Sequence, residues 1–368
     1  MKLSLSRGEE LRPSNVAKSA RRGWPKAAAG YVLAFVCLLW VFRHLDLAEL
    51  LRRVADMNLA WVGAAILCVV LSYVCQGMRW QLLLSPLAPV TVMRTTRAIY
   101  AGLFVNEVLP LRLGEIVRAV LISRWTSLKL RSIVASILIE RLCDGLWLAV
   151  GVVVVLVLVP LPRRLIEAGD VFWIVIFVAI VVFSWFVFSA RSAWANNPGN
   201  PVPVETETAR DSTEPTTPSL LRRLVHAVTP FMRGALLDLR IVGYTSSALV
   251  ACILSLVMLL LQALSMWLAM RAYGLHQVTF PAGLAVFIIV HLGTMVPAAP
   301  GNIGTYQFFT VLGLTLFGVD KTTAVGFSLV VFALLSIPLV VIGFWAFGTS
   351  GLTLPEVRSG LTNARGVN

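Results

Sequence analysis

Long apolar runs constrain this chain more than any other feature of its sequence. A helix needs about 20 apolar residues to cross the hydrocarbon core of a bilayer. Six segments reach that length, at 24–42, 60–84, 132–159, 171–190, 245–271 and 323–347. Only 13% of the residues are charged, whereas a soluble domain carries about 25%. The sequence therefore predicts an all-α, polytopic membrane protein with about six spanning helices.

Two further apolar stretches are interrupted by proline, glycine and charged residues. The stretch 98–123 contains NEVLPLRLGE, and the stretch 281–318 contains VPAAPGNIG. A continuous lipid-facing helix does not tolerate this density of proline and glycine, because its backbone groups would stay unsatisfied. Each stretch is therefore predicted to form a re-entrant broken hairpin. Since the two breaks fall at matching places in the two halves of the chain, we expect an inverted repeat, which is typical of transporter sites.

The basic residues predict the orientation of the chain. The net charge is +13, and most of the basic residues lie between the apolar segments, so they indicate topology and headgroup contacts rather than nucleic-acid binding. The basic arm 1–23, the polar loop 191–240 and the tail 348–368 are predicted to be cytoplasmic. The amphipathic stretch 43–58 is expected to rest on the opposite surface. The predicted location is the cell (inner) membrane, with both termini cytoplasmic.

The first interrupted stretch places charges at membrane depth. It carries Glu107, Arg112, Glu115 and Arg118, and insertion scales give a cost of roughly 2.5–3.5 kcal/mol for each charge at the bilayer centre. If a helix starts near Leu113, Glu115 and Arg118 can pair along it. One interpretation is that Arg112 and Arg118 bind a lipid phosphate through their planar guanidinium groups. The alternative is a structural ion-pair network.

Two of the predicted spans also carry charged residues. Glu140, Arg141 and Asp144 lie well inside the span 132–159, where they form either an internal salt bridge to neighbouring helices or a polar lining that handles protons. Arg79 and Trp80 close the preceding span. We expect them to be an interfacial anchor, because arginine snorkels and tryptophan prefers the headgroup level.

The second interrupted stretch has a strong turn signal at Pro300 and Gly301. The backbone from Gly301 to Gly304 then opens onto a predicted helix, whose free N–H groups favour an anion. The alternative is a tight hairpin in which the glycines serve packing. His291 is more typical of a hydrogen-bonded interior histidine than of a proton relay.

Four motifs in this order resemble one known family: GMRWQLLL, NEVLPLRLGEIVRA, ERLCDG and VPAAPGNIG. This is the flippase-like, or lysylphosphatidylglycerol synthase transmembrane-region, family, which includes the membrane half of the multiple peptide resistance factor. The resemblance covers about residues 30–347 and implies a flippase-like domain over 24–347. It implies substrate-binding roles for Asn106, Arg112, Glu115, Arg118, Glu140, Arg141, Asp144, Pro300, Gly301, Gly304 and Gln307. Gln307 stands where the family usually has a glutamate.

The expected function is that of a lipid translocase that binds an anionic headgroup between the two hairpins. The expected partners are anionic or polyprenyl-phosphate lipids, with no nucleic acid, no cofactor and no metal, and we do not expect an enzyme. The loop and the tail are too small for a soluble aminoacyl-transfer domain. The alternatives are a non-transporting accessory protein of envelope lipid or glycan synthesis and an intramembrane enzyme that acts on lipid-linked phosphates.

Overall fold

The computed structural model describes residues 31–43, 45–109, 113–159, 246–295 and 299–351. Within these ranges the secondary structure is helical, with short turns between the helices. The predicted arm, the polar loop, most of the tail and the predicted span 171–190 lie outside the described residues. Pro110, Arg112 and Pro297 also lie outside them.

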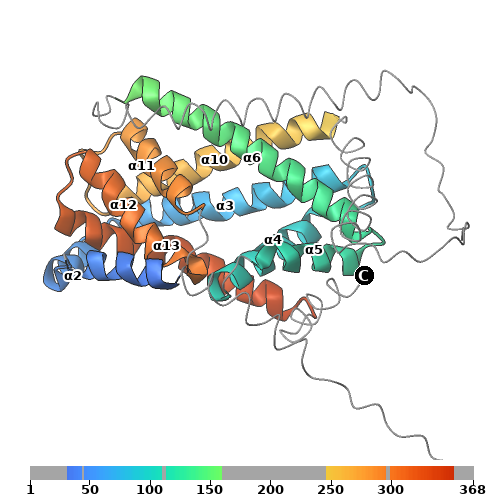
Figure 1. Cartoon of the computed structure of the whole chain (residues 1–368), viewed down its shortest axis with the longest axis horizontal. Coiled ribbons are helices and arrows are strands. Elements are labelled where there is room, and N and C mark those ends of the chain that lie inside the picture. The colour runs from blue at the N-terminus through green and yellow to red at the C-terminus, as the bar shows by residue number, and fades with distance from the viewer. Residues whose placement is uncertain (1–30, 44, 110–112, 160–245, 296–298, 352–368) are drawn as a thin grey trace, which may run out of the picture.

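Among the residues that the structure describes, four helices are long and apolar enough to cross a membrane. They are α3 (Leu59–Leu84), α6 (Leu130–Leu158), α10 (Ser246–Ala272) and α13 (Lys321–Gly348). Their long axes run in roughly the same direction through the molecule (Figure 1). They confirm four of the six predicted spans, so the chain is a polytopic helical membrane protein.

A bent pair of helices precedes α3. The helix Tyr31–Phe42 covers the described part of the predicted first span, and α2 (Leu47–Ala55) follows it at an angle of 83°. The Asp46 side chain caps α2 by accepting a hydrogen bond of 3.1 Å from the backbone N–H of Glu49. The predicted amphipathic stretch is therefore a separate short helix, and the bent pair could count as a fifth span.

Each interrupted stretch forms two short helices. The first gives α4 (Val92–Val108) and α5 (Gly114–Trp125), and the second gives α11 (Phe280–Gly293) and α12 (Thr305–Leu316), with a short 3₁₀ turn at Pro300–Asn302. At 1.5 Å per residue these helices are about 18–26 Å long, which is less than the ~30 Å of the hydrocarbon core. Helices α4 and α5 lie toward one end of the molecule, and α11 and α12 toward the other (Figure 1).

The two halves of the chain pack against each other through matching elements. Helix α3 packs along α10, and the Ser265 hydroxyl of α10 donates a hydrogen bond of 2.7 Å to the Ala65 carbonyl of α3. Helix α4 of the first half packs on α13 of the second, where the rings of Phe104 and Phe344 lie 5.7 Å apart. Helix α11 of the second half packs in turn on α6 of the first. The short helices are thus held by the opposite half of the chain.

Candidate functional site

Two adjoining cavities lie where the short helices meet the long ones. Their volumes are about 510 and 250 Å³, and they share wall residues that include Tyr73, Glu107 and His291. The larger cavity is lined by charged residues at Glu115, Arg118, Arg141 and Asp144. The smaller one has apolar and aromatic residues such as Val69, Phe287 and Phe332 in its wall, together with polar ones such as Gln262 and Ser336. The combined space therefore has a strongly charged part and a less polar part, as an amphipathic ligand requires.

The break between α4 and α5 places two charged side chains on the wall of the larger cavity. The Asn106 side chain accepts a hydrogen bond of 2.7 Å from the backbone N–H of Gly114, so it satisfies one of the free donors at the start of α5. The two helices also touch closely, because a Cβ atom at Gly114 would overlap the carbonyl oxygen of Gly102. This contact places Glu115 and Arg118, in the first turns of α5, on the cavity wall.

Arg79 is at the centre of a buried ion-pair cluster and not at the membrane interface. Its side chain is fully buried, 2.5 Å from the Glu140 carboxylate and paired also with Asp144. It donates a further hydrogen bond of 2.7 Å to the Ser255 hydroxyl of α10. Trp80 is also fully buried. The predicted interfacial anchor is wrong, because carboxylates on α6 compensate the arginine inside the helix bundle, and snorkelling to the surface is then unnecessary.

Arg118 is committed to internal partners. Its Nη2 atom lies 2.5 Å from Glu115 and 3.0 Å from Glu140, and only 4% of the side chain is exposed. The guanidinium group also lies over the Trp80 ring, 4.9 Å from its centroid. The predicted pairing of Glu115 with Arg118 along one helix is confirmed. The structure thus supports an ion-pair network at Arg118, with little guanidinium surface left for a ligand.

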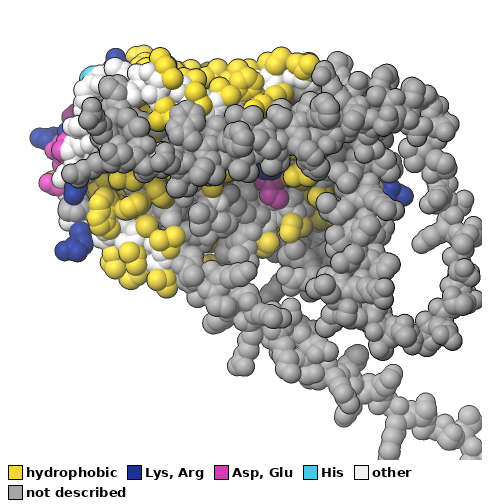
Figure 2. Space-filling view, turned by 45° about the horizontal axis from the view of Figure 1, so that its top comes forward, with side chains coloured by type: hydrophobic (Ala, Val, Ile, Leu, Met, Phe, Trp, Pro, Cys, Tyr) yellow, Lys and Arg dark blue, Asp and Glu magenta, His cyan; other side chains and the backbone are white. Residues whose placement is uncertain are grey.

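Arg141 is the open member of the cluster. Its side chain is 49% exposed, and its nearest carboxylates are Glu115 at 3.3 Å and Asp144 at 3.9 Å. Arg79, Arg118 and Arg141 are thus balanced by Glu115, Glu140 and Asp144. In Figure 2 a small group of acidic and basic side chains is visible in the middle of the molecule, beside hydrophobic ones. The long distances around Arg141 leave it able to accept another anionic partner.

The second hairpin contributes its turn to the cavity. Gly301 has a φ of +61° and lies against the Glu107 side chain, where a Cβ atom would overlap the carboxylate. Gly304, with a φ of +91°, donates its backbone N–H over 2.7 Å to the Gln307 side chain. Gln307 therefore caps its own helix and is buried. Of the residues predicted in this hairpin, Gly301 lines the cavity, whereas Pro300, Gly304 and Gln307 are not among the wall residues.

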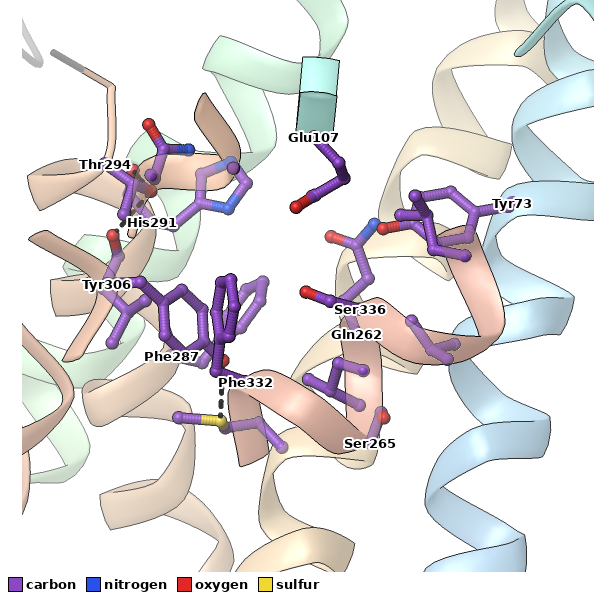
Figure 3. Close-up of a pocket in the computed structure, with 17 residues that line it drawn as sticks. Tyr73, Glu107, Gln262, Ser265, Phe287, His291, Thr294, Tyr306, Phe332 and Ser336 are labelled. Atoms are coloured by element: carbon purple, nitrogen blue, oxygen red, sulfur yellow. Dashed lines mark hydrogen bonds between the residues drawn. The ribbon is translucent and has the colours of Figure 1, made fainter. Parts of the chain in front are cut away.

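Several wall residues were not selected from the sequence. Glu107 was recognised as an acid at membrane depth but was not chosen as a site residue, although a carboxylate beside a helix break is a detectable signal. Tyr73 and Gln262 come from the long apolar helices α3 and α10, and Thr294 directly follows α11; Figure 3 shows all three around the same space as Glu107. No local pattern marks Tyr73 or Gln262, whereas Thr294 lies just before the break at Pro297. In the described part of the chain, no group of three or more His, Cys, Asp or Glu residues could hold a metal ion.

Comparison with known proteins identifies the family. The sequence matches the family described as lysylphosphatidylglycerol synthase TM region over residues 27–343. It is also similar to a protein described as a UPF0104 membrane protein of Methanothermobacter thermautotrophicus, with 23% identity over 306 residues that cover 82% of this chain and 86% of the relative. The family resemblance inferred from the four motifs is confirmed. Since the match covers most of its length, this chain belongs to the lysylphosphatidylglycerol synthase transmembrane-region family.

Proposed function

We propose that this protein binds the headgroup of an anionic membrane lipid in the charged cavity and moves it between the two leaflets. The observation that carries the proposal is the half-exposed Arg141, which lies on the wall of a cavity of about 510 Å³ at the meeting point of the two broken hairpins. A guanidinium group with loosely held partners is suited to a lipid phosphate. The sequence predicted a phosphate contact through Arg112 and Arg118. Arg112 lies outside the described residues and Arg118 is enclosed by carboxylates, so we assign the contact to Arg141.

The packing of the two halves supports an inverted repeat of re-entrant hairpins. The arms of both hairpins are shorter than the hydrocarbon core, and α4 packs against the Pro300–Asn302 turn. Two discontinuous segments that contact each other are the arrangement in which transporters build their binding sites. The less polar cavity beside the charged one would accept the start of the acyl chains.

A reconstituted assay tests the proposal. Purified protein is placed in vesicles that contain a fluorescent anionic phospholipid, and the fraction of the lipid that is accessible to an external quencher is followed over time. We expect wild-type protein to speed the exchange between leaflets. Arg141→Gln should weaken headgroup binding roughly tenfold, because one charge-assisted contact is worth about 1.5 kcal/mol. The variant should therefore exchange lipid more slowly than the wild type. Arg124→Gln, which changes an exposed arginine on α5 outside the cavity wall, is the matched control.

The same vesicles distinguish the alternatives. If wild-type protein moves neither anionic phospholipids nor polyprenyl phosphates, the proposal fails and a non-transporting accessory role is favoured. If lipid is hydrolysed or a group is transferred, an intramembrane enzyme is favoured. If Arg141→Gln and Arg124→Gln transport equally well, the assignment of Arg141 is wrong.

A further inference from the structure

Glu107 occupies the point where the two hairpins touch. It is the last but one residue of α4, and its carboxylate lies so close to Gly301 that a Cβ atom there would overlap Oε2. Figure 3 shows the Glu107 side chain directed into the cavity, with His291 and Thr294 on one side and Gln262 and Ser336 below it. The carboxylate therefore belongs at once to the first hairpin, to the cavity and to the contact with the second hairpin.

No positive group in the described part of the chain pairs with Glu107. The cavity arginines Arg118 and Arg141 have their carboxylate partners on α5 and α6. Glu107 takes part in none of the ion pairs and accepts no hydrogen bond among the described residues. It is partly buried beside Tyr73 and Phe287. A carboxylate that is charged in such surroundings costs several kcal/mol, so a bound proton stabilises it there.

The groups around Glu107 do not supply a permanent counter-charge. The titratable and charged residues that share its cavity walls are Tyr73 of α3, Glu115 and Arg118 of α5, Arg141 and Asp144 of α6, His291 of α11 and Tyr306 of α12. The side chains contributed by α10 and α13, such as Gln262 and Ser336, are uncharged. Together with Arg79, the two cavity arginines balance the three acids Glu115, Glu140 and Asp144, so Glu107 remains an additional acid.

We propose that Glu107 binds and releases a proton during each transport cycle and thereby couples lipid movement to a proton gradient. The neutral carboxyl group can lie against the Gly301 backbone and the apolar wall, which favours contact between the hairpins. The charged carboxylate requires water, which favours their separation. A proton taken up from water on one side and released to water on the other thus biases two arrangements of the hairpins. Only the O–H bond of Glu107 forms and breaks.

The experiment measures lipid exchange in vesicles with an imposed pH difference, and the coupling rests on the transport proposed above. We expect the exchange rate of the wild type to change with the pH difference and to lose this response when a protonophore is added. Glu107→Gln, which resembles the protonated form, should exchange lipid at a rate that no longer depends on the pH difference. Glu107→Asp should retain it in part. Glu49→Gln, on α2 and outside the cavity, should behave as the wild type.

A second measurement addresses protonation without transport. Dicyclohexylcarbodiimide reacts with protonated carboxyl groups in apolar surroundings, so mass spectrometry should detect labelling of Glu107 at neutral pH, with less labelling as the pH rises and little labelling of Glu49. Transport by the wild type with no response to the pH difference, or a response that survives in Glu107→Gln, overturns the coupling and leaves lipid transport intact. The absence of Glu107 labelling at neutral pH also overturns it. The absence of lipid exchange by the wild type refutes the proposed transport and, with it, the coupling.

Discussion

Replacing Arg79 by methionine tests whether the buried ion-pair cluster holds the helix bundle together. Arg79 joins three helices, because it extends from α3 to Glu140 and Asp144 on α6 and to Ser255 on α10. Methionine removes the charge and keeps an unbranched apolar stem of similar length. The substitution leaves the Glu140 carboxylate, which is fully buried, without its closest partner.

The expected cost follows from what remains around the acids. Removing one partner of a buried ion pair destabilises proteins by about 3–5 kcal/mol. Here Glu140 keeps Arg118 at 3.0 Å, and Asp144 is 30% exposed and keeps Arg141 at 3.9 Å. Neither acid is left wholly unpaired, so we expect the lower end of that range, about 3 kcal/mol.

The free energy of unfolding can be measured by titrating the protein from mild detergent into SDS and following helix content by circular dichroism. Arg94→Met, which changes an exposed arginine at the start of α4, is the control and should cost much less. Adding Glu140→Gln to Arg79→Met should cost less than the sum of the single changes, because the partner charge has already been removed. Equal effects of Arg79→Met and Arg94→Met, or strict additivity in the double variant, would refute this reasoning.

Three further substitutions test local features of the same fold, all by the same SDS titration. Partial burial opposes the charged form of Asp320, but hydrogen bonds from Thr323 outweigh it and lower the pKa of this carboxyl group. Asp320→Ala removes a helix cap and should therefore lower the free energy of unfolding by about 1 kcal/mol at neutral pH. This difference between variant and wild type should shrink as the pH falls below about 3.9, the pKa of an aspartate in the unfolded chain. A difference that stays the same in acid would contradict this. Gly301→Ala should cost about 1–2 kcal/mol, because φ is +61°, and no cost would show that the turn relaxes freely. Trp80→Phe removes the 3.0 Å hydrogen bond to the Ser136 hydroxyl and should cost about 1 kcal/mol; a stabilised variant would contradict a net contribution from that bond.

The sequence alone determined the long helices and the places where the other helices break. Apolar length is a local property, and the thickness of the bilayer converts it directly into a spanning helix. The breaks between α4 and α5 and between α11 and α12 were also predictable, because proline and glycine are clustered there, whereas the single Pro338 is accommodated inside α13. The pairing of Glu115 with Arg118 was also predictable, because residues three apart share a face of one helix.

Only the tertiary structure decided which charges are available in the cavity. Arg79 and Glu140 are 61 residues apart in the chain, and nothing near either residue indicates that they meet. Their pairing requires α3 and α6 to bring opposite charges to the same depth, where the low dielectric makes pairing far preferable to isolation. That contact buries Arg79, which was expected at the surface. The side chain of Arg141 stays half-exposed, and the carboxylate of Glu107 has no ion-pair or hydrogen-bond partner among the described residues. Packing of distant segments, which no local pattern encodes, thus separates structural charges from candidate functional ones.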